Sequence, residues 1–177
     1  MDGGNLLQKE YLLVDGYNII HAWDELKELL EVSLESARQK LIDILSNYQG
    51  IKKNTVILVF DGHLVKGNIG TVYQHHNIYV VYTKEAETAD HYIERVVHGL
   101  PKHYAIRVAT SDALEQLIIL GNGATRISAI ELYHEVKGVE KNIRERYIEK
   151  RPPKNNMLAD NIDKEALEWI EKLRRTK

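Results

Sequence analysis

Four aspartates of this 177-residue chain lie where an apolar segment ends or where the next segment begins. Asp15 and Asp61 directly follow apolar runs, Asp90 opens a helical pattern, and Asp112 lies three residues after a further run. Carboxylates gathered at one edge would repel one another unless a cation neutralised them. Oxygen ligands suit Mg²⁺ or Mn²⁺, which keep open positions for phosphate oxygens. The chemistry indicated is metal-assisted hydrolysis of a phosphodiester bond, in which the metal activates water.

The sequence predicts strands that alternate with helices, and these elements would determine where the four acids lie. Continuous apolar runs are typical of strands that are buried on both faces of a parallel sheet, and apolar residues at helical spacing separate them. The pattern predicts an α/β three-layer sandwich with a central, mostly parallel sheet of about five strands. In such a sheet the active crevice lies outside the carboxyl ends of the strands. The predicted strands are 11–14, 56–60, 78–82, 105–109 and 124–127, and the predicted helices are 34–48, 89–100, 112–120, 128–151 and 163–175.

Each acid also has a structural alternative. Asp112 could cap the N-terminus of a helix, and Asp61 could serve an ordinary Asp-Gly turn. Asp90 could belong to a solvated helix face. Asp15 is harder to explain in this way, because an acid directly after a buried run must be paired, metal-bound or solvated at the rim. The shared location of the four acids favours the metal site.

Four polar residues close to the acids could support a site. Asn18 follows Asp15 by three residues and could orient a ligand or water from a loop, or form an Asx turn. Lys66 could meet a phosphate or be an exposed loop lysine. Thr110 and Ser111 could hydrogen-bond a phosphate or cap the following helix. The eight histidines show no metal-ligand spacing, which leaves packing or surface roles for them.

The composition excludes several classes of protein. The chain has no cysteine, which rules out disulfides, cysteine-ligated zinc, iron–sulfur centres and thiol nucleophiles. No apolar run approaches the ~20 residues of a membrane span, and residues 1–10 do not resemble a signal peptide. We therefore expect a cytoplasmic protein without a membrane partner. No glycine-rich nucleotide motif is present, so a nucleotide cofactor is not expected.

A basic segment lies between residues 137 and 154, where seven basic side chains stand against three acidic ones. This surplus could face an anionic partner, although a solvated helix of mixed charge would explain the same counts. The candidate docking residues for such a partner are Lys137, Lys141, Arg144, Arg146, Lys150 and Arg151.

Four blocks of sequence together resemble the YacP-type NYN-domain family. The blocks are LVDGYNII (13–20), VFDGHLVKG (59–67), TKEAETAD (83–90) and VATSD (108–112), and the similarity covers about residues 11–151. The resemblance implies a PIN-like nuclease fold, a divalent-metal site and RNA endonuclease activity. It divides the chain into an N-terminal extension (1–10), the NYN domain (11–151) and a C-terminal helical tail (152–177).

The resemblance also implies roles for individual residues. Asp15 and Asp90 would be the principal metal-binding carboxylates and Asp112 the third, while Asn18 and Asp61 would support them. The chain departs from the family pattern at residue 62, where we expect alanine to be frequent and glycine stands here. Either small residue is expected to leave the geometry of the neighbouring acid intact.

The carboxylates at the sheet edge indicate metal-dependent hydrolysis, and the resemblance implies an endoribonuclease that cuts mRNA in association with the translating ribosome. Affinity for free RNA usually comes from a basic surface, and the formal net charge of −2 is weak for such binding. This charge fits an enzyme that a larger partner positions on its substrate. The main alternative is a non-catalytic RNA-binding or ribosome-binding module of the same fold. An aspartyl-phosphate phosphotransferase is disfavoured, because it typically has a second acid two positions after the first, where Tyr17 stands.

Overall fold

A single six-stranded sheet forms the centre of the computed structural model, which describes residues 9–62, 70–111 and 123–149. The strand order is β3-β4-β2-β1-β5-β6, and every neighbouring pair except β3 and β4 is parallel. The five predicted strands and the mostly parallel sheet are therefore confirmed. The strands are β1 (Glu10–Asp15), β2 (Thr55–Phe60), β3 (Thr71–His75), β4 (Ile78–Tyr82), β5 (Ala105–Ala109) and β6 (Thr125–Ile127).

The prediction of about five strands missed β3. This strand pairs antiparallel with β4 through a short turn in which His76 adopts a positive φ of 51°. Four of its five residues are exposed, because it lies at the edge of the sheet and β4 is its only neighbour among the described strands. A strand in that position needs no continuous apolar run, so the signal that revealed the buried strands is absent from it.

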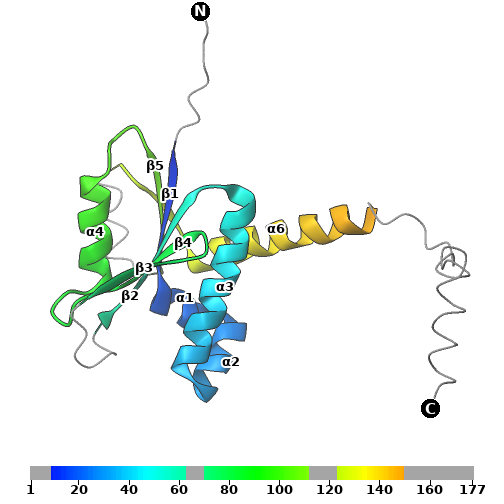
Figure 1. The fold of residues 1–177 in the computed structure, drawn as a ribbon, viewed down its shortest axis with the longest axis horizontal. Coiled ribbons are helices and arrows are strands. Elements are labelled where there is room, and N and C mark those ends of the chain that lie inside the picture. The colour runs from blue at the N-terminus through cyan, green and yellow to red at the C-terminus, as the bar shows by residue number, and fades with distance from the viewer. Residues whose placement is uncertain (1–8, 63–69, 112–122, 150–177) are drawn as a thin grey trace, which may run out of the picture. The chain divides into compact units, whose positions relative to one another are not determined.

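Helices cover both faces of the sheet. One face carries α1 (Gly16–Ala22), α2 (Asp24–Val32) and α3 (Leu34–Lys52), and the other carries α4 (Ala89–Gly99). Figure 1 shows α3 and α4 on opposite sides of the strands. Two separate apolar clusters, one on each face, confirm the three-layer arrangement.

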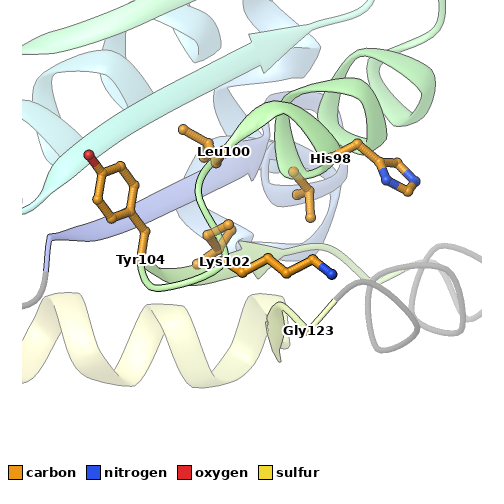
Figure 2. A pocket seen from close by; sticks show the side chains of 7 residues that line it. His98, Leu100, Lys102, Tyr104 and Gly123 are labelled. Atoms are coloured by element: carbon orange, nitrogen blue, oxygen red, sulfur yellow. The ribbon is translucent and has the colours of Figure 1, made fainter.

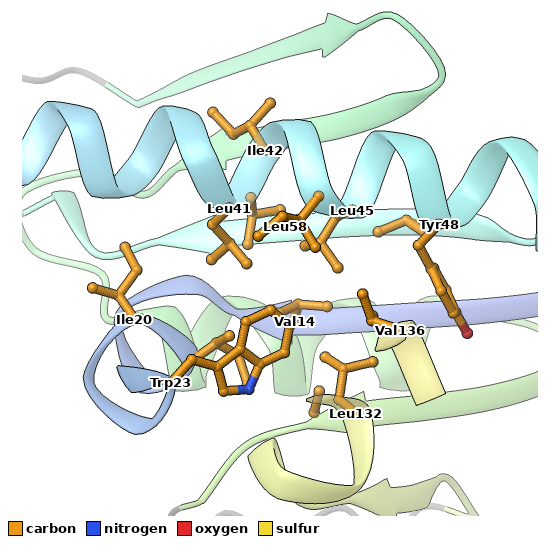
Figure 3. Packing of buried hydrophobic residues seen from close by; sticks show 14 of the residues in the cluster. Val14, Ile20, Trp23, Leu41, Ile42, Leu45, Tyr48, Leu58, Leu132 and Val136 are labelled. Carbon is orange, nitrogen blue, oxygen red and sulfur yellow. The ribbon is translucent and has the colours of Figure 1, made fainter. Parts of the chain in front are cut away.

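The larger apolar cluster lies between the sheet and the helices α1 to α3. Val14 and Leu58 from the strands meet Leu41 and Leu45 from α3, and all four side chains are fully buried (Figure 3). The indole N–H of Trp23 donates to the carbonyl oxygen of Ala129 at 2.8 Å, which attaches the start of α6 (Ala129–Glu149) to the same cluster.

The long helix predicted for 128–151 is confirmed as α6. Its start is fixed by a reciprocal capping box, in which the Ser128 N–H donates to Glu131 at 2.7 Å and the Glu131 N–H donates to the Ser128 hydroxyl at 3.2 Å. The chain divides into two compact units, residues 1–140 and 141–177, so the boundary falls within this helix. No helix in the described ranges is long and apolar enough to cross a membrane.

Two helices, α1 and α2, were not predicted, whereas the helices predicted for 34–48 and 89–100 are confirmed as α3 and α4. The α1 sequence is short and begins with glycine, so its stability comes from its cap at Asp15 and from the burial of Ile19 and Ile20. The predicted helices at 112–120 and 163–175 lie outside the described residues.

Candidate active site

Asp15 lies at the point where the strand order of the sheet reverses. The chain runs from β1 to β2 and β4 on one side, and then to β5 and β6 on the other, which makes the carboxyl end of β1 the expected position of an active crevice. Asp15 is the last residue of β1 and only 8% exposed. Its Oδ1 accepts a hydrogen bond from the Asn18 N–H at 3.1 Å, so the carboxylate also caps α1.

The electrostatic environment of Asp15 shows which acids the fold brings together. The pKa of Asp15 is raised to about 6, mainly by burial and also by the negative charges of Asp90 and Asp61, against the lowering effect of the Asn18 N–H. Asp61 and Asp90 are therefore close enough to act on Asp15, so three of the four predicted acids lie at one edge of the sheet. A buried carboxylate that two neighbouring acids repel is a group that gains from a bound cation.

Asp61 and Asp90 lie near Asp15 on two different segments of the chain, one after β2 and one at the start of α4. Asp61 directly follows β2 and is half-buried, whereas Asp90 is the second residue of α4 and is exposed. The hydroxyl of Thr88 caps α4 by accepting from the His91 N–H at 3.3 Å. The cap fixes where α4 starts and thereby the position of Asp90 in its first turn.

Thr83 holds the loop of Asp61 against the loop that leads to Asp90, and we call this contact the Thr83 clasp. The Thr83 N–H donates to the Phe60 carbonyl at 3.0 Å, and the Gly62 N–H donates to the Thr83 hydroxyl at 2.9 Å. The same hydroxyl donates to the carbonyl oxygen of Glu87 at 2.5 Å. Thr83 is 1% exposed, so the clasp is a buried contact between the two loops.

The expectation that either glycine or alanine would serve at residue 62 is wrong for this structure. A Cβ atom on Gly62 would lie 1.8 Å from the backbone carbonyl oxygen of Thr83, a distance at which the backbone itself must move. The missing side chain at Gly62 is what allows the two loops of the Thr83 clasp to approach so closely.

Asn18 lies in α1 and not in a loop as predicted, because the Asp15 cap starts the helix immediately after the strand. Its side-chain oxygen accepts a hydrogen bond from the Ser111 N–H at 2.8 Å. Asn18 therefore connects the Asp15 cap to the segment that follows β5. Thr110 in that segment is fully buried, whereas Ser111 is exposed.

The donor set of the site fits a hard divalent cation. Within the described ranges, no three histidine or acidic side chains are close enough to hold a metal ion together. Mg²⁺ is commonly held by only one or two carboxylates together with water and phosphate oxygens, and Asp15 with its two acidic neighbours supplies oxygen donors alone. Asp112 and Lys66, which were also predicted for the site, lie outside the described residues.

Arg38 was missed by the sequence reasoning. It is 7% exposed on the apolar face of α3, where its Nε–H donates to the Tyr17 hydroxyl at 2.9 Å and a second guanidinium N–H donates to the same oxygen. Its Nη1 donates to Glu35 at 3.2 Å. A signal was available, because the arginine lies four residues after Leu34 and three before Leu41, within an apolar helical stripe.

The predicted docking residues have different environments. Lys137, in the first compact unit, forms an ion pair with Glu25 at 3.0 Å and lies 5.4 Å from the centre of the Tyr133 ring. Arg144 and Arg146, in the second unit, are exposed, and neither has an ion pair with another described residue. Lys141 is within 3.8 Å of Glu145, and Lys150 and Arg151 lie outside the described residues.

A cavity of about 540 Å³ lies away from the acids, at the C-terminal end of α4 and the start of β5 (Figure 2). His98, Lys102 and Tyr104 line it. Ala105 at the start of β5 pairs with Glu10, at the end of β1 opposite to Asp15. The cavity is therefore not part of the carboxylate site.

Comparisons with known proteins agree with this architecture. A Bacillus subtilis (strain 168) protein described as uncharacterized protein YacP is 44% identical over 167 residues, which cover 94% of this chain and 97% of that protein. A crystal structure of Rae1 (YacP) from Bacillus subtilis matches with a TM-score of 0.69 and 43% identity over 94% of this chain and 95% of that chain. A tryptophan-to-leucine variant of Rae1 matches with the same TM-score and identity over 82% and 86% of the two chains. The model of the YacP-like NYN domain matches residues 12–175, and the chain belongs to this family.

Proposed function

We propose that this protein is a divalent-metal-dependent endoribonuclease that hydrolyses phosphodiester bonds of mRNA at the translating ribosome. The observation that carries the proposal is the burial of Asp15 at the switch point of the sheet, where the charges of Asp61 and Asp90 act on it. Membership of the YacP-like NYN family supports a nuclease, and the relationship to Rae1 supports a role at the ribosome.

In this proposal, Asp15 and Asp90 hold Mg²⁺ or Mn²⁺, with Asp112 and Asp61 as further oxygen donors. The bound metal supplies an activated water and stabilises the charge on the leaving oxygen. Asn18 keeps the Asp15 carboxylate in place through the cap of α1. The Thr83 clasp keeps Asp61 at a fixed separation from the start of α4.

The decisive experiment compares cleavage by the wild type and by Asp15→Asn, with Mg²⁺ or Mn²⁺, on naked RNA and on translating ribosomes. We expect the variant to lose cleavage while it keeps its fold, because asparagine can still cap a helix. Asp24→Asn is a matched control, since Asp24 is an exposed acid in the first turn of α2. Full activity of Asp15→Asn would remove this residue from the mechanism. Absence of cleavage by the wild type, with ribosome binding intact, would favour the non-catalytic module.

Docking to the ribosome has a separate test. Arg144 and Arg146 are exposed and unpaired among the described residues, so they are available to an anionic surface such as ribosomal RNA. Reversal of both charges to glutamate is expected to reduce co-sedimentation with ribosomes while cleavage of naked RNA, if the wild type cuts it, stays the same. Unchanged co-sedimentation would remove these two arginines from the docking surface.

A further inference from the structure

Four aromatic rings form a row that starts beside the acids and ends at the edge of the sheet. Tyr17 follows Asp15 by two residues and its ring centre lies 5.2 Å from that of Phe60, which directly precedes Asp61. The Phe60 ring centre lies 5.3 Å from that of Tyr82, and the Tyr82 ring centre lies 6.4 Å from that of Tyr73. The row therefore crosses β2, β4 and β3 in the order in which these strands are paired.

The outer three rings of this row are stacked. The planes of Phe60 and Tyr82 differ by 24°, and those of Tyr82 and Tyr73 differ by 12°. Exposure rises along the row, from Phe60, which is fully buried, through Tyr82, which is half-buried, to Tyr73, which is 38% exposed. Because β3 is the edge strand of the described sheet, no other strand in the described ranges extends the stack beyond Tyr73. A flat ring that approached from outside could continue it.

Arg38 gives this aromatic row a positive charge. Its guanidinium carbon lies 5.3 Å from the ring centre of Tyr17, 5.9 Å from that of Phe60 and 5.6 Å from that of Tyr82. Its acidic partner Glu35 is 71% exposed, so water screens that charge more than it screens the buried guanidinium. Stacked rings with a cation beneath them are the combination by which proteins hold single-stranded nucleic acid.

The position of the row decides which partner it fits. Its inner end lies beside the acids, since Phe60 directly precedes Asp61 and Tyr17 follows Asp15 by two residues, while its outer end at Tyr73 is open to solvent. Tyr73 lies two strand spacings, about 10 Å, from β2, which Asp61 follows, and three spacings, about 14 Å, from β1, which ends at Asp15. A base close to the cleaved phosphate fits that separation better than a distant part of the RNA.

We propose that Tyr73, supported by Tyr82 and Arg38, is a stacking platform for a nucleobase close to the bond that is cut. The inference rests on the proposed function, since it requires single-stranded RNA at the acids. Stacking on a tyrosine does not distinguish strongly between bases, so the platform would orient the strand without requiring a particular sequence.

The test separates binding from chemistry. Cleavage is measured with enzyme in excess, on whichever substrate the wild type cuts, naked RNA or the translating ribosome. Tyr73→Leu is expected to raise the enzyme concentration for half-maximal rate about five- to tenfold, at the lower end of the effect of losing one stacked base. The maximal rate should stay within about twofold, because Tyr73 does not contact the reacting atoms. Tyr73→Phe should behave like the wild type.

Val72→Ala is the matched control. Val72 is the neighbouring residue on β3 and is 62% exposed, but its cross-strand partner Val81 belongs to the apolar cluster on the other face of the sheet. For the wild type, an RNA with one abasic nucleotide near the cleavage site should raise the enzyme concentration for half-maximal rate as much as Tyr73→Leu does. For the Tyr73→Leu variant, the same RNA should raise this concentration little further.

The outcomes keep the two ideas apart. Asp15-dependent cleavage with the same half-maximal concentration in Tyr73→Leu and the wild type would overturn the platform and leave the nuclease in place. An equal effect of Val72→Ala would also overturn the platform, since it would show a general effect of the edge strand. A wild type that cuts neither substrate would overturn the nuclease and the platform together.

Discussion

Replacement of Asp15 by asparagine is expected to stabilise the metal-free protein while it abolishes cleavage. The ionised carboxylate is unfavourable where it lies, because burial and two neighbouring acids raise its pKa from 3.8 to about 6. Asparagine removes the charge, has nearly the same shape and can accept the same hydrogen bond from the Asn18 N–H. The substitution therefore removes the unfavourable charge without removing the cap.

The magnitude follows from the two pKa values. Their difference corresponds to about 3 kcal/mol, since one pKa unit is worth about 1.4 kcal/mol. Because the folded-state pKa of Asp15 is the higher one, the folded state binds the proton more tightly, and the wild type loses stability as the pH rises from 3.8 to about 6. The advantage of asparagine should be close to its full value at pH 7.5 and nearly absent at pH 4.

The assay is urea unfolding and thermal unfolding of both proteins in EDTA at pH 7.5 and at pH 4. An advantage of about 3 kcal/mol would raise the melting temperature by about 6–12 °C at pH 7.5. Asp24→Asn is the control, because Asp24 is an exposed acid that is not among the charges acting on Asp15, and its substitution should change the stability by less than about 0.5 kcal/mol. A less stable Asp15→Asn, or an equal gain at both pH values, would refute the reasoning about buried charge.

Three further predictions concern the metal, the loop contact and the core. Mg²⁺ or Mn²⁺ should raise the melting temperature of the wild type but not that of Asp15→Asn, as thermal unfolding with and without the ion would show. Gly62→Ala should lower the free energy of unfolding by at least about 2 kcal/mol, because its Cβ would meet a backbone oxygen at 1.8 Å, whereas Gly138→Ala, with no atom within 4 Å, should stabilise α6 by about 0.5–1 kcal/mol. Glu135→Gln should cost about 2 kcal/mol at pH 7, because hydrogen bonds from Arg107 and two other residues lower the pKa of Glu135 to about 2. That difference should be complete above pH 4.5 and shrink as the pH falls towards 2, which denaturation at pH 7 and pH 3 would reveal.

The sequence predicts those parts of the fold whose stability is local or whose burial is complete. β1 and β2 are recognisable as apolar runs because both of their faces are covered, whereas β3 has exposed residues on both faces and leaves no such pattern. The helix α1 is likewise hidden, since seven residues form a helix here only with the Asp15 cap and the packing of Ile19 and Ile20.

The candidate site divides in the same way. Asp15 was found because an acid after a buried strand needs an explanation, and the fold places it as expected. The Thr83 clasp could not be predicted, because its partners are 21 residues apart and meet only when β2 and β4 pair. Arg38 left a readable signal in its helix, but its partner Tyr17 is identified only by the packing of α1 against α3.

The hydrogen bonds around Asn18 make two backbone amides sensitive to events at the carboxylate. The Asn18 N–H donates to the Asp15 carboxylate, and the Ser111 N–H donates to the Asn18 side chain. The chemical shift and exchange rate of both protons therefore depend on whether the carboxylate binds an ion. Titration of an ¹⁵N-labelled sample with Mg²⁺ should therefore move these two resonances together. A divalent ion could be followed at Asp15 by nuclear magnetic resonance in the absence of RNA, of a ribosome and of any turnover.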